Sequence, residues 1–268
     1  MTEKEWLAAG DPMPMLEFLR GKTSERKKRL FALACCYKII HLIPNEEAKK
    51  AVGVAERIAE GDPSAVRDDE FTVEVFGIAF GYTGGFPMRH DRMIAFHATY
   101  AAYDLLPPVL PPTDESGILP PSLVPFSDRA WGFALSSHSQ PDLLHTPIQV
   151  AKTVASGHRV SDEDPFQEEV VVRELKAQVP LLRDVFGNPF RPISINPIWL
   201  TSTVTNLAQT AYDERILPSG ELDPARLAIL SDALEEAGCD NAEILNHLRG
   251  AGPHVRGCWV LDLLLAKE

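Results

Sequence analysis

The chain has 268 residues, of which 45% are hydrophobic, so it can bury a substantial core, and an intrinsically disordered protein is excluded. Its 26 basic and 38 acidic side chains give a formal net charge of −12, which makes nucleic acids and anionic membrane surfaces poor partners. No apolar run reaches the roughly 20 residues that cross a bilayer, and Met1 to Glu5 lack the basic and apolar regions of a signal peptide. We therefore expect a cytoplasmic protein without a membrane or nucleic-acid partner.

Helical signals dominate the N-terminal part of the chain. Thr2 and Glu5 have the spacing of a capping box, in which a hydroxyl and a carboxylate satisfy two backbone N–H groups at the start of a helix. Asp11-Pro12 is a second helix start, and Pro44 ends a long apolar helix that begins with the basic run 26–29. In a chain with this net charge, we interpret that run as a solvated helix face. These patterns predict helices over residues 3–9, 12–20, 24–43 and 46–60.

The middle of the chain is less regular. Residues 64–80 include an alternating, strand-like pattern but lie between helical segments, and we predict a helix there. A helical pattern covers residues 89–106. Seven prolines follow between Pro107 and Pro125, a density that excludes a regular helix or a central strand. We interpret residues 107–125 as a proline-rich loop or a linker between two lobes.

Helical periodicity returns in the C-terminal half. Asn196-Pro197 and Asp223-Pro224 are helix starts, and Gly238 is a typical residue at a helix end. Such patterns predict helices over residues 128–135, 147–155, 166–186, 198–216, 224–237 and 242–249, with a closing strand or helix after Pro253. The sequence therefore predicts an all-α fold, an irregular helical array with a long proline-rich loop. Residues 1–106 and 126–268 would form its lobes, packed separately or as a single domain.

Two parts of the chain resemble an uncharacterised family of planctomycete proteins. The segments that carry the resemblance are MTEKEWL (1–7), PMLEFLRGK (14–22), LRDVFGNPFRP (182–192) and HVRGCW (254–259). The likeness covers the beginning and the last part of the chain, whereas the proline-rich middle does not match. Because the family has no established activity, the resemblance implies no catalytic residue.

The C-terminal region contains a candidate metal site. Cys239, His247, His254 and Cys258 supply two thiolates and two imidazoles, which would satisfy a tetrahedral zinc ion. The turn and short helix between them could bring the four side chains together. Their spacing lacks the close Cys-x-x-Cys pair of diagnostic zinc motifs, so the alternative is a set of buried structural cysteines and helix-end histidines. Apart from this zinc ion, no cofactor is predicted.

The same region is rich in polar side chains that interrupt apolar segments. Arg183, Asn188, Arg191, Arg215 and Arg256 could form a buried network that holds the Asn-Pro-Phe-Arg-Pro turn against the last helices. Alternatively, the arginines could line an anion-binding pocket. Cys258, which lies close to Arg256, is a further candidate for a nucleophile, although proximity in sequence does not fix direction in space.

These features support three functions of different classes. The first, which we favour, is a non-catalytic cytoplasmic protein-interaction or scaffold protein that presents its proline-rich loop to a protein partner. The second is a helical protein stabilised by zinc through the C-terminal Cys/His residues. The third is a hydrolase or transferase with an arginine-rich C-terminal pocket. The sequence identifies no catalytic residue and leaves the oligomeric state open.

Overall fold

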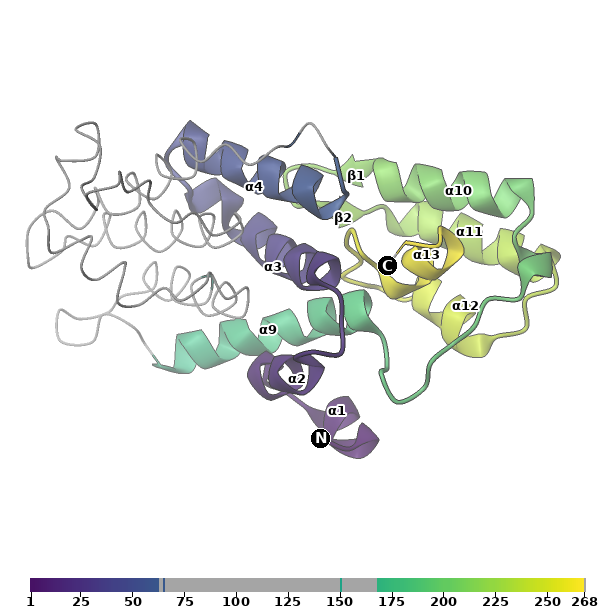
Figure 1. The fold of residues 1–268 in the computed structure, drawn as a ribbon, viewed down its shortest axis with the longest axis horizontal. Coiled ribbons are helices and arrows are strands. Elements are labelled where there is room, and N and C mark those ends of the chain that lie inside the picture. The colour runs from purple at the N-terminus through teal and green to yellow at the C-terminus, as the bar shows by residue number, and fades with distance from the viewer. Residues whose placement is uncertain (63–64, 66–149, 151–167, 268) are drawn as a thin grey trace, which may run out of the picture. The chain divides into compact units, whose positions relative to one another are not determined.

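The computed structural model describes residues 1–62, 65, 150 and 168–267, and this part of the chain is mostly helical (Figure 1). Its strands form one hairpin of two residues each. The predicted all-α fold is thereby confirmed. The helices predicted over residues 64–80, 89–106, 128–135 and 147–155 and the proline-rich segment fall almost entirely outside the described residues. None of the described helices has the length and apolar character needed to span a bilayer.

The chain divides into two compact units. The first combines Met1–Lys38 with Val172–Glu268 and so contains both ends of the chain, and the second comprises Ile39–Val171. The described part of the second unit consists mainly of a 3-10 turn, η1 (Ile40–Leu42), and helix α4 (Glu46–Ala59). The side chains discussed below belong to the first unit.

The N-terminal helices begin where the capping residues predict. Thr2 and Glu5 form the expected capping box of α1 (Glu3–Ala8): the Glu5 N–H donates to the Thr2 hydroxyl at 3.3 Å, and the Thr2 N–H donates to the Glu5 carboxylate at 2.7 Å. The Asp11 side chain accepts from the N–H of Met13 at the start of α2 (Pro12–Leu19). The basic run opens the next helix, α3 (Glu25–Ile39).

The C-terminal part of the unit contains five helices, a 3-10 turn and the hairpin. They are α9 (Glu168–Phe186), η3 (Pro197–Trp199), α10 (Ser202–Asp213), β1 (Arg215–Ile216), β2 (Glu221–Leu222), α11 (Pro224–Glu236), α12 (Ala242–Leu248) and α13 (Trp259–Leu264). The closing element is therefore a helix, and α9 continues through Pro180 as one element.

One predicted helix, over residues 198–216, is shorter than expected at both ends. The Asn196 cap starts only the three-residue turn η3, and the chain begins α10 again after Thr201, whose hydroxyl accepts from the Val204 N–H at 3.2 Å. At the other end, Arg215 and Ile216 leave the helix to pair with β2. At the first end, the Thr201 hydroxyl is a second cap after Asn196. At the other end, pairing with β2 replaces the helical hydrogen bonds, so local hydrogen bonds outweigh the helical periodicity at both ends.

Helices α10 to α13 surround an apolar core. Helix α10 contacts α11 and α13, and α12 contacts the same two helices. The buried side chains come from all four helices: Val204, Ala208, Tyr212, Leu227, Leu230, Leu234, Ile244, Leu248, Val260 and Leu261. The hairpin adds Leu222, whose N–H donates to the carbonyl oxygen of His254 at 2.8 Å. This bond anchors the loop between α12 and α13 to the hairpin.

Gly257 lies in the turn that leads into α13, in close contact with α3. Its φ is +90°, a value that favours glycine. A Cβ atom at this position would lie 2.9 Å from Cδ1 and 3.1 Å from Cβ of Leu30. The turn therefore packs against α3 more closely than any other residue type would allow.

We expect Gly257→Ala to lower the free energy of unfolding by about 1–3 kcal/mol, because the backbone strain adds to the clash with Leu30. Gly238→Ala is the matched control, since Gly238 has a similar φ of +86° but no heavy atom near its Cβ position. Urea unfolding of both variants separates the two contributions. Equal losses of stability would show that contact with Leu30 contributes nothing.

Candidate metal centre

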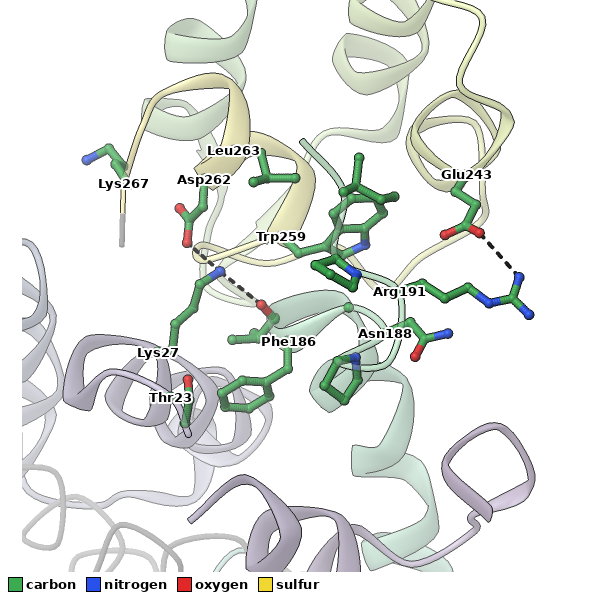
Figure 2. Close-up of a pocket in the computed structure, with 15 residues that line it drawn as sticks. Thr23, Lys27, Phe186, Asn188, Arg191, Glu243, Trp259, Asp262, Leu263 and Lys267 are labelled. Atoms are coloured by element: carbon green, nitrogen blue, oxygen red, sulfur yellow. Dashed lines mark hydrogen bonds and ion pairs between the residues drawn. The ribbon is translucent and has the colours of Figure 1, made fainter. Parts of the chain in front are cut away.

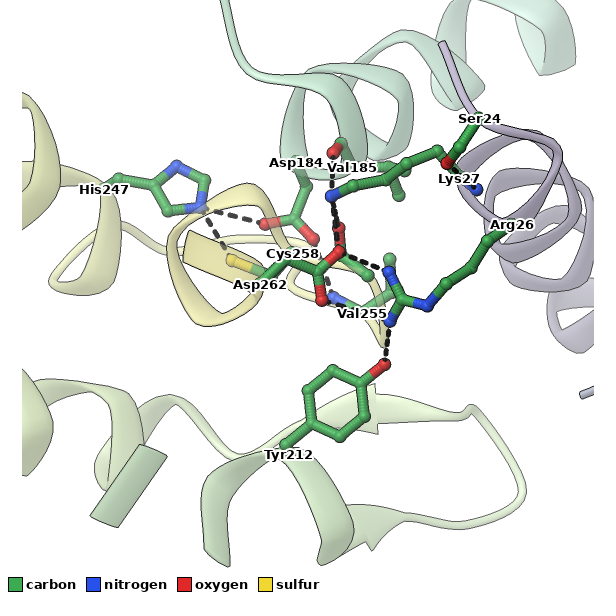
Figure 3. A network of polar contacts seen from close by, with 11 residues as sticks. Ser24, Arg26, Lys27, Asp184, Val185, Tyr212, His247, Val255, Cys258 and Asp262 are labelled. Atoms are coloured by element: carbon green, nitrogen blue, oxygen red, sulfur yellow. Dashed lines mark hydrogen bonds and ion pairs between the residues drawn. The ribbon is translucent and has the colours of Figure 1, made fainter. Parts of the chain in front are cut away.

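Four side chains with metal-ligating atoms converge in the first unit. Asp184, His247, His254 and Cys258 each offer one ligand atom, and these atoms all lie within 4.8 Å of one another. His247 is partly exposed and the other three are buried. Asp184, His247 and Cys258 point toward one another in Figure 3.

The four side chains come from two helices, α9 and α12, and from the segment between α12 and α13. Asp184 lies near the end of α9, where its neighbours Leu181, Leu182 and Val185 are buried. His247 is in the last turn of α12, and Cys258 is the residue before α13. His254 lies in the loop between them, which the hairpin anchors. Helix packing therefore places Asp184, whereas local turns place the other three.

Short contacts join the four side chains. Oδ1 of Asp184 lies 2.8 Å from Nδ1 of His254 and 3.1 Å from Nε2 of His247. The same Nε2 atom lies 3.2 Å from Sγ of Cys258. The ring of His247 also meets that of His254 edge-on, with centroids 4.9 Å apart. The potential ligand atoms are thus one carboxylate oxygen, two imidazole nitrogens and one sulfur.

Two of the ligands are held by further hydrogen bonds. The Val255 N–H donates to Oδ2 of Asp184 at 2.8 Å, which leaves Oδ1 directed at the histidines. Nε2 of His254 faces the carbonyl oxygen of Gly250 at 3.2 Å. Because a carbonyl oxygen only accepts, Nε2 carries a proton and Nδ1 is the nitrogen available to a metal. Histidine ligands in metalloproteins commonly donate their second ring N–H in this way.

The comparisons with known proteins do not identify the site. A scan of protein-family models and searches of curated proteins and of solved structures found no match. The resemblance to planctomycete proteins stays a prediction. The function of the site is therefore argued from its own geometry and chemistry.

Zinc fits the donor atoms of this group. Zinc–ligand distances of about 2.0–2.3 Å put the ligand atoms of a tetrahedral site roughly 3.3–3.8 Å apart. The contacts of 2.8 to 3.2 Å are somewhat shorter than this, and the widest separation is at most 4.8 Å. Side-chain shifts of about 1 Å or less would bring the four atoms to tetrahedral positions. The site could therefore accept zinc without rearrangement of the helices.

In the absence of a metal, Asp184 and His254 stabilise each other as an ion pair. Burial acts to raise the pKa of Asp184, but hydrogen bonds from His247 and His254 outweigh it and lower the pKa below its ordinary value. Burial acts to lower the pKa of His254, but its contacts with Asp184 and Gly250 outweigh burial and raise the pKa of the ring above its ordinary value. Both ring nitrogens of His254 face oxygen acceptors, which suits the protonated imidazolium.

Cys258 lacks the properties of a nucleophile. Burial raises the pKa of its thiol well above the ordinary value, and the charge of Asp184 adds to this effect. The backbone N–H groups of Leu261 and Val260 and the Lys27 ammonium act in the opposite direction without reversing it. A reactive cysteine needs an accessible thiolate, whereas Cys258 is fully buried and its raised pKa favours the thiol form. A bound metal ion would instead deprotonate the thiol by direct coordination.

Three of the four predicted ligands belong to this group, and Cys239 does not. Cys239 follows the end of α11, is buried in the apolar core, and donates its N–H to the Leu234 carbonyl at 2.9 Å. Asp184 completes the group instead. The signal for Asp184 in the sequence is an acidic residue within an otherwise apolar helix face, which marks a buried and paired carboxylate.

Of the five polar residues proposed as a network, Asn188 and Arg191 share Glu3 as a partner, whereas the contacts of the other three lie elsewhere. Nη2 of Arg183 donates to the carbonyl oxygens of Trp6, Leu7 and Ala9, and so caps the end of α1. Asn188 donates to Glu3 at 2.9 Å.

The other three residues contact different elements. Arg191 pairs with Glu3 at 2.5 Å and with Glu243 at 3.6 Å. Arg215 donates to the Tyr37 hydroxyl at 3.1 Å. Arg256 donates to the Tyr212 carbonyl at 3.4 Å and lies over the ring of that tyrosine. The contacts tie the Asn-Pro-Phe-Arg-Pro turn to α1 and α12, and the arginines do not converge on one point.

A cavity of about 320 Å³ lies beside this turn (Figure 2). Asn188 and Arg191 line it, whereas Arg183, Arg215 and Arg256 are not among its lining residues. Its basic side chains Lys27, Arg191 and Lys267 are accompanied by the acidic Glu243 and Asp262, and Arg191 and Lys27 form ion pairs with acidic groups. The lining therefore has little excess positive charge with which to hold an anion.

Proposed function

We propose that the protein is a helical protein stabilised by one zinc ion, which Asp184, His247, His254 and Cys258 bind. The convergence of four ligand atoms in a largely buried position carries this proposal. Further support comes from the hydrogen bonds that orient Asp184 and His254 toward the same centre.

The ligand count favours a structural role over a catalytic one. Four protein ligands complete a tetrahedral zinc site, whereas catalytic zinc sites keep one position for water or substrate. Burial of Asp184, His254 and Cys258 also limits access of a substrate. Zinc would join α9 to the C-terminal segment that contains α12 and α13. This function is non-catalytic, in agreement with the absence of a catalytic motif in the sequence.

The charges of the ligands match a divalent ion. One carboxylate and one thiolate balance the two positive charges of Zn²⁺, so the buried centre would be neutral. Two imidazoles and a soft thiolate also suit zinc better than Mg²⁺ or Ca²⁺, since those ions prefer oxygen ligands. The scaffold function rests on the proline-rich segment, which lies outside the described residues, and the described arginine contacts do not favour a hydrolase or transferase.

Metal analysis of two cysteine variants tests the proposal. After reconstitution with zinc and removal of the excess, we expect one zinc ion per wild-type chain and its loss in Cys258→Ser, because a hydroxyl is a poor replacement for a thiolate ligand. Cys239→Ser is the matched control, since Cys239 is a buried cysteine of the same core and lies outside the ligand group. It should keep the zinc. Wild-type protein that retains no zinc would refute the proposed function.

A further inference from the structure

Lys27, on α3, contacts the backbone beside two of the four proposed ligands. Its Nζ donates to the carbonyl oxygen of Val185 at 2.9 Å and to that of Gly257 at 2.8 Å. Val185 follows Asp184 in the chain, and Gly257 precedes Cys258. Figure 3 shows the ammonium of Lys27 between these segments. One side chain from the N-terminal part of the chain therefore bridges the ends of α9 and of the loop before α13.

The ammonium of Lys27 is fixed in position by a third contact. Nζ also lies 2.5 Å from Oδ2 of Asp262, so its three N–H donors match three acceptors. The side chain is only 15% exposed, and a buried ammonium is stable only while its partners stay in place. Loss of either carbonyl contact would be unfavourable, and the ammonium thus restrains both segments.

Neighbouring residues of α3 hold the same region. Arg26 makes two contacts with the carboxylate of Asp262, at 2.8 and 3.2 Å, and donates to the Tyr212 hydroxyl at 2.6 Å. One turn further along α3, Leu30 packs against Gly257. The first turns of α3 therefore contact the segment that carries Cys258, and among Arg26, Lys27 and Leu30 it is Lys27 that also bonds to the end of α9, at Val185.

We propose that Lys27 is a positioning residue of the zinc site, which sets the separation of Asp184 and Cys258 by binding the carbonyl groups beside them. The inference rests on the proposed zinc function. It assigns to α3, which provides no ligand, a role in metal affinity. Lys27 would act through the backbone and not by contact with the metal.

Zinc affinity of a Lys27→Met variant tests this role. Methionine keeps the apolar stem and removes the ammonium, and we expect the affinity for zinc, measured by competition with a chromophoric chelator, to fall roughly 10- to 100-fold. Lys28→Met is the matched control, because Lys28 is the next residue and pairs with Glu25 of its own helix. Its affinity should equal that of the wild type. Lys27→Arg retains donors for both carbonyls and should restore much of the affinity.

A purely structural role would give a different result. If Lys27 only stabilised the fold, Lys27→Met would lower the melting temperatures of the zinc-free and zinc-loaded protein equally. A positioning role predicts that zinc raises the melting temperature of Lys27→Met less than that of the wild type. Equal zinc affinity of Lys27→Met and wild type would overturn the inference and leave the zinc site intact, whereas failure of the wild type to bind zinc would refute the site itself. If Lys27→Met does not fold, Lys27→Gln is compared in the same way, and unchanged affinity again overturns the inference.

Discussion

Replacement of Asp184 by alanine should lower the free energy of unfolding by about 3–5 kcal/mol in a buffer that contains a chelator. In the metal-free protein, the carboxylate accepts from Val255 and contacts the rings of His247 and His254. It is 3% exposed, and His254 is 4% exposed, so water cannot replace these contacts. The variant would leave a buried backbone N–H and a buried imidazole without their acceptor.

Urea unfolding measures this loss, and an exposed aspartate provides the control. Asp232 pairs with Arg249 at 2.8 Å, but its side chain is 68% exposed, and such surface pairs contribute about 1 kcal/mol or less. Asp232→Ala should therefore change stability little. Similar losses in the two variants would mean that the buried contacts of Asp184 contribute no more to stability than a surface ion pair.

The fold was largely predictable because helix starts depend on local chemistry. Thr2 and Asp11 cap helices through bonds to residues two or three positions away, and such spacings can be found in a sequence. The helix predicted over residues 198–216 was wrong at both ends, and this error also has a local cause. Thr201 offers a second cap five residues after Asn196, and the sequence alone does not decide which cap begins the longer helix.

The candidate site was only partly predictable, for a different reason. His247 and Cys258 are eleven residues apart, so the loop between α12 and α13 brings them together. Asp184 is 70 residues from His254, and only the packing of α9 against the C-terminal segment places it there. Cys239 is close to His247 in sequence, but it points into the apolar core. Sequence proximity therefore predicted the three members of the group that are close in sequence, and it included Cys239 where the structure places Asp184.

The contacts of Lys27 could not be predicted from the sequence for the same reason, their long range. Its bond to Val185 spans 158 residues and that to Gly257 spans 230. In the sequence, Lys27 is one of several charges at the start of a helix and was predicted to be solvated, whereas its side chain is only 15% exposed. A buried, hydrogen-bonded lysine at the start of a helix can be distinguished from a solvated lysine only when the acceptors around it are known.

Zinc should raise the stability of the protein without being required for its fold. At a free zinc concentration 1,000 times the dissociation constant, linkage adds about 4 kcal/mol, which corresponds to a rise in melting temperature on the order of 10 °C. The metal-free site is closed by its own hydrogen bonds, so chelator-treated protein should keep its helical circular dichroism at 25 °C. Calorimetry with zinc or with a chelator checks both expectations, and Mg²⁺, which prefers oxygen ligands, is the control.

The increase in stability that zinc produces should grow with pH, because zinc competes with protons for the same ligand atoms. Coordination requires Nδ1 of His254 and the thiol of Cys258 to lose their protons, so binding weakens as pH falls. The raised pKa of His254 stabilises the metal-free protein below the ordinary histidine pKa of about 6.5, and this contribution is lost as pH rises through the folded value. Both effects enlarge the difference between zinc-loaded and metal-free protein above that pH. A difference that stays constant from pH 5.5 to about pH 8, across the range where histidine titrates, would contradict coordination by His254.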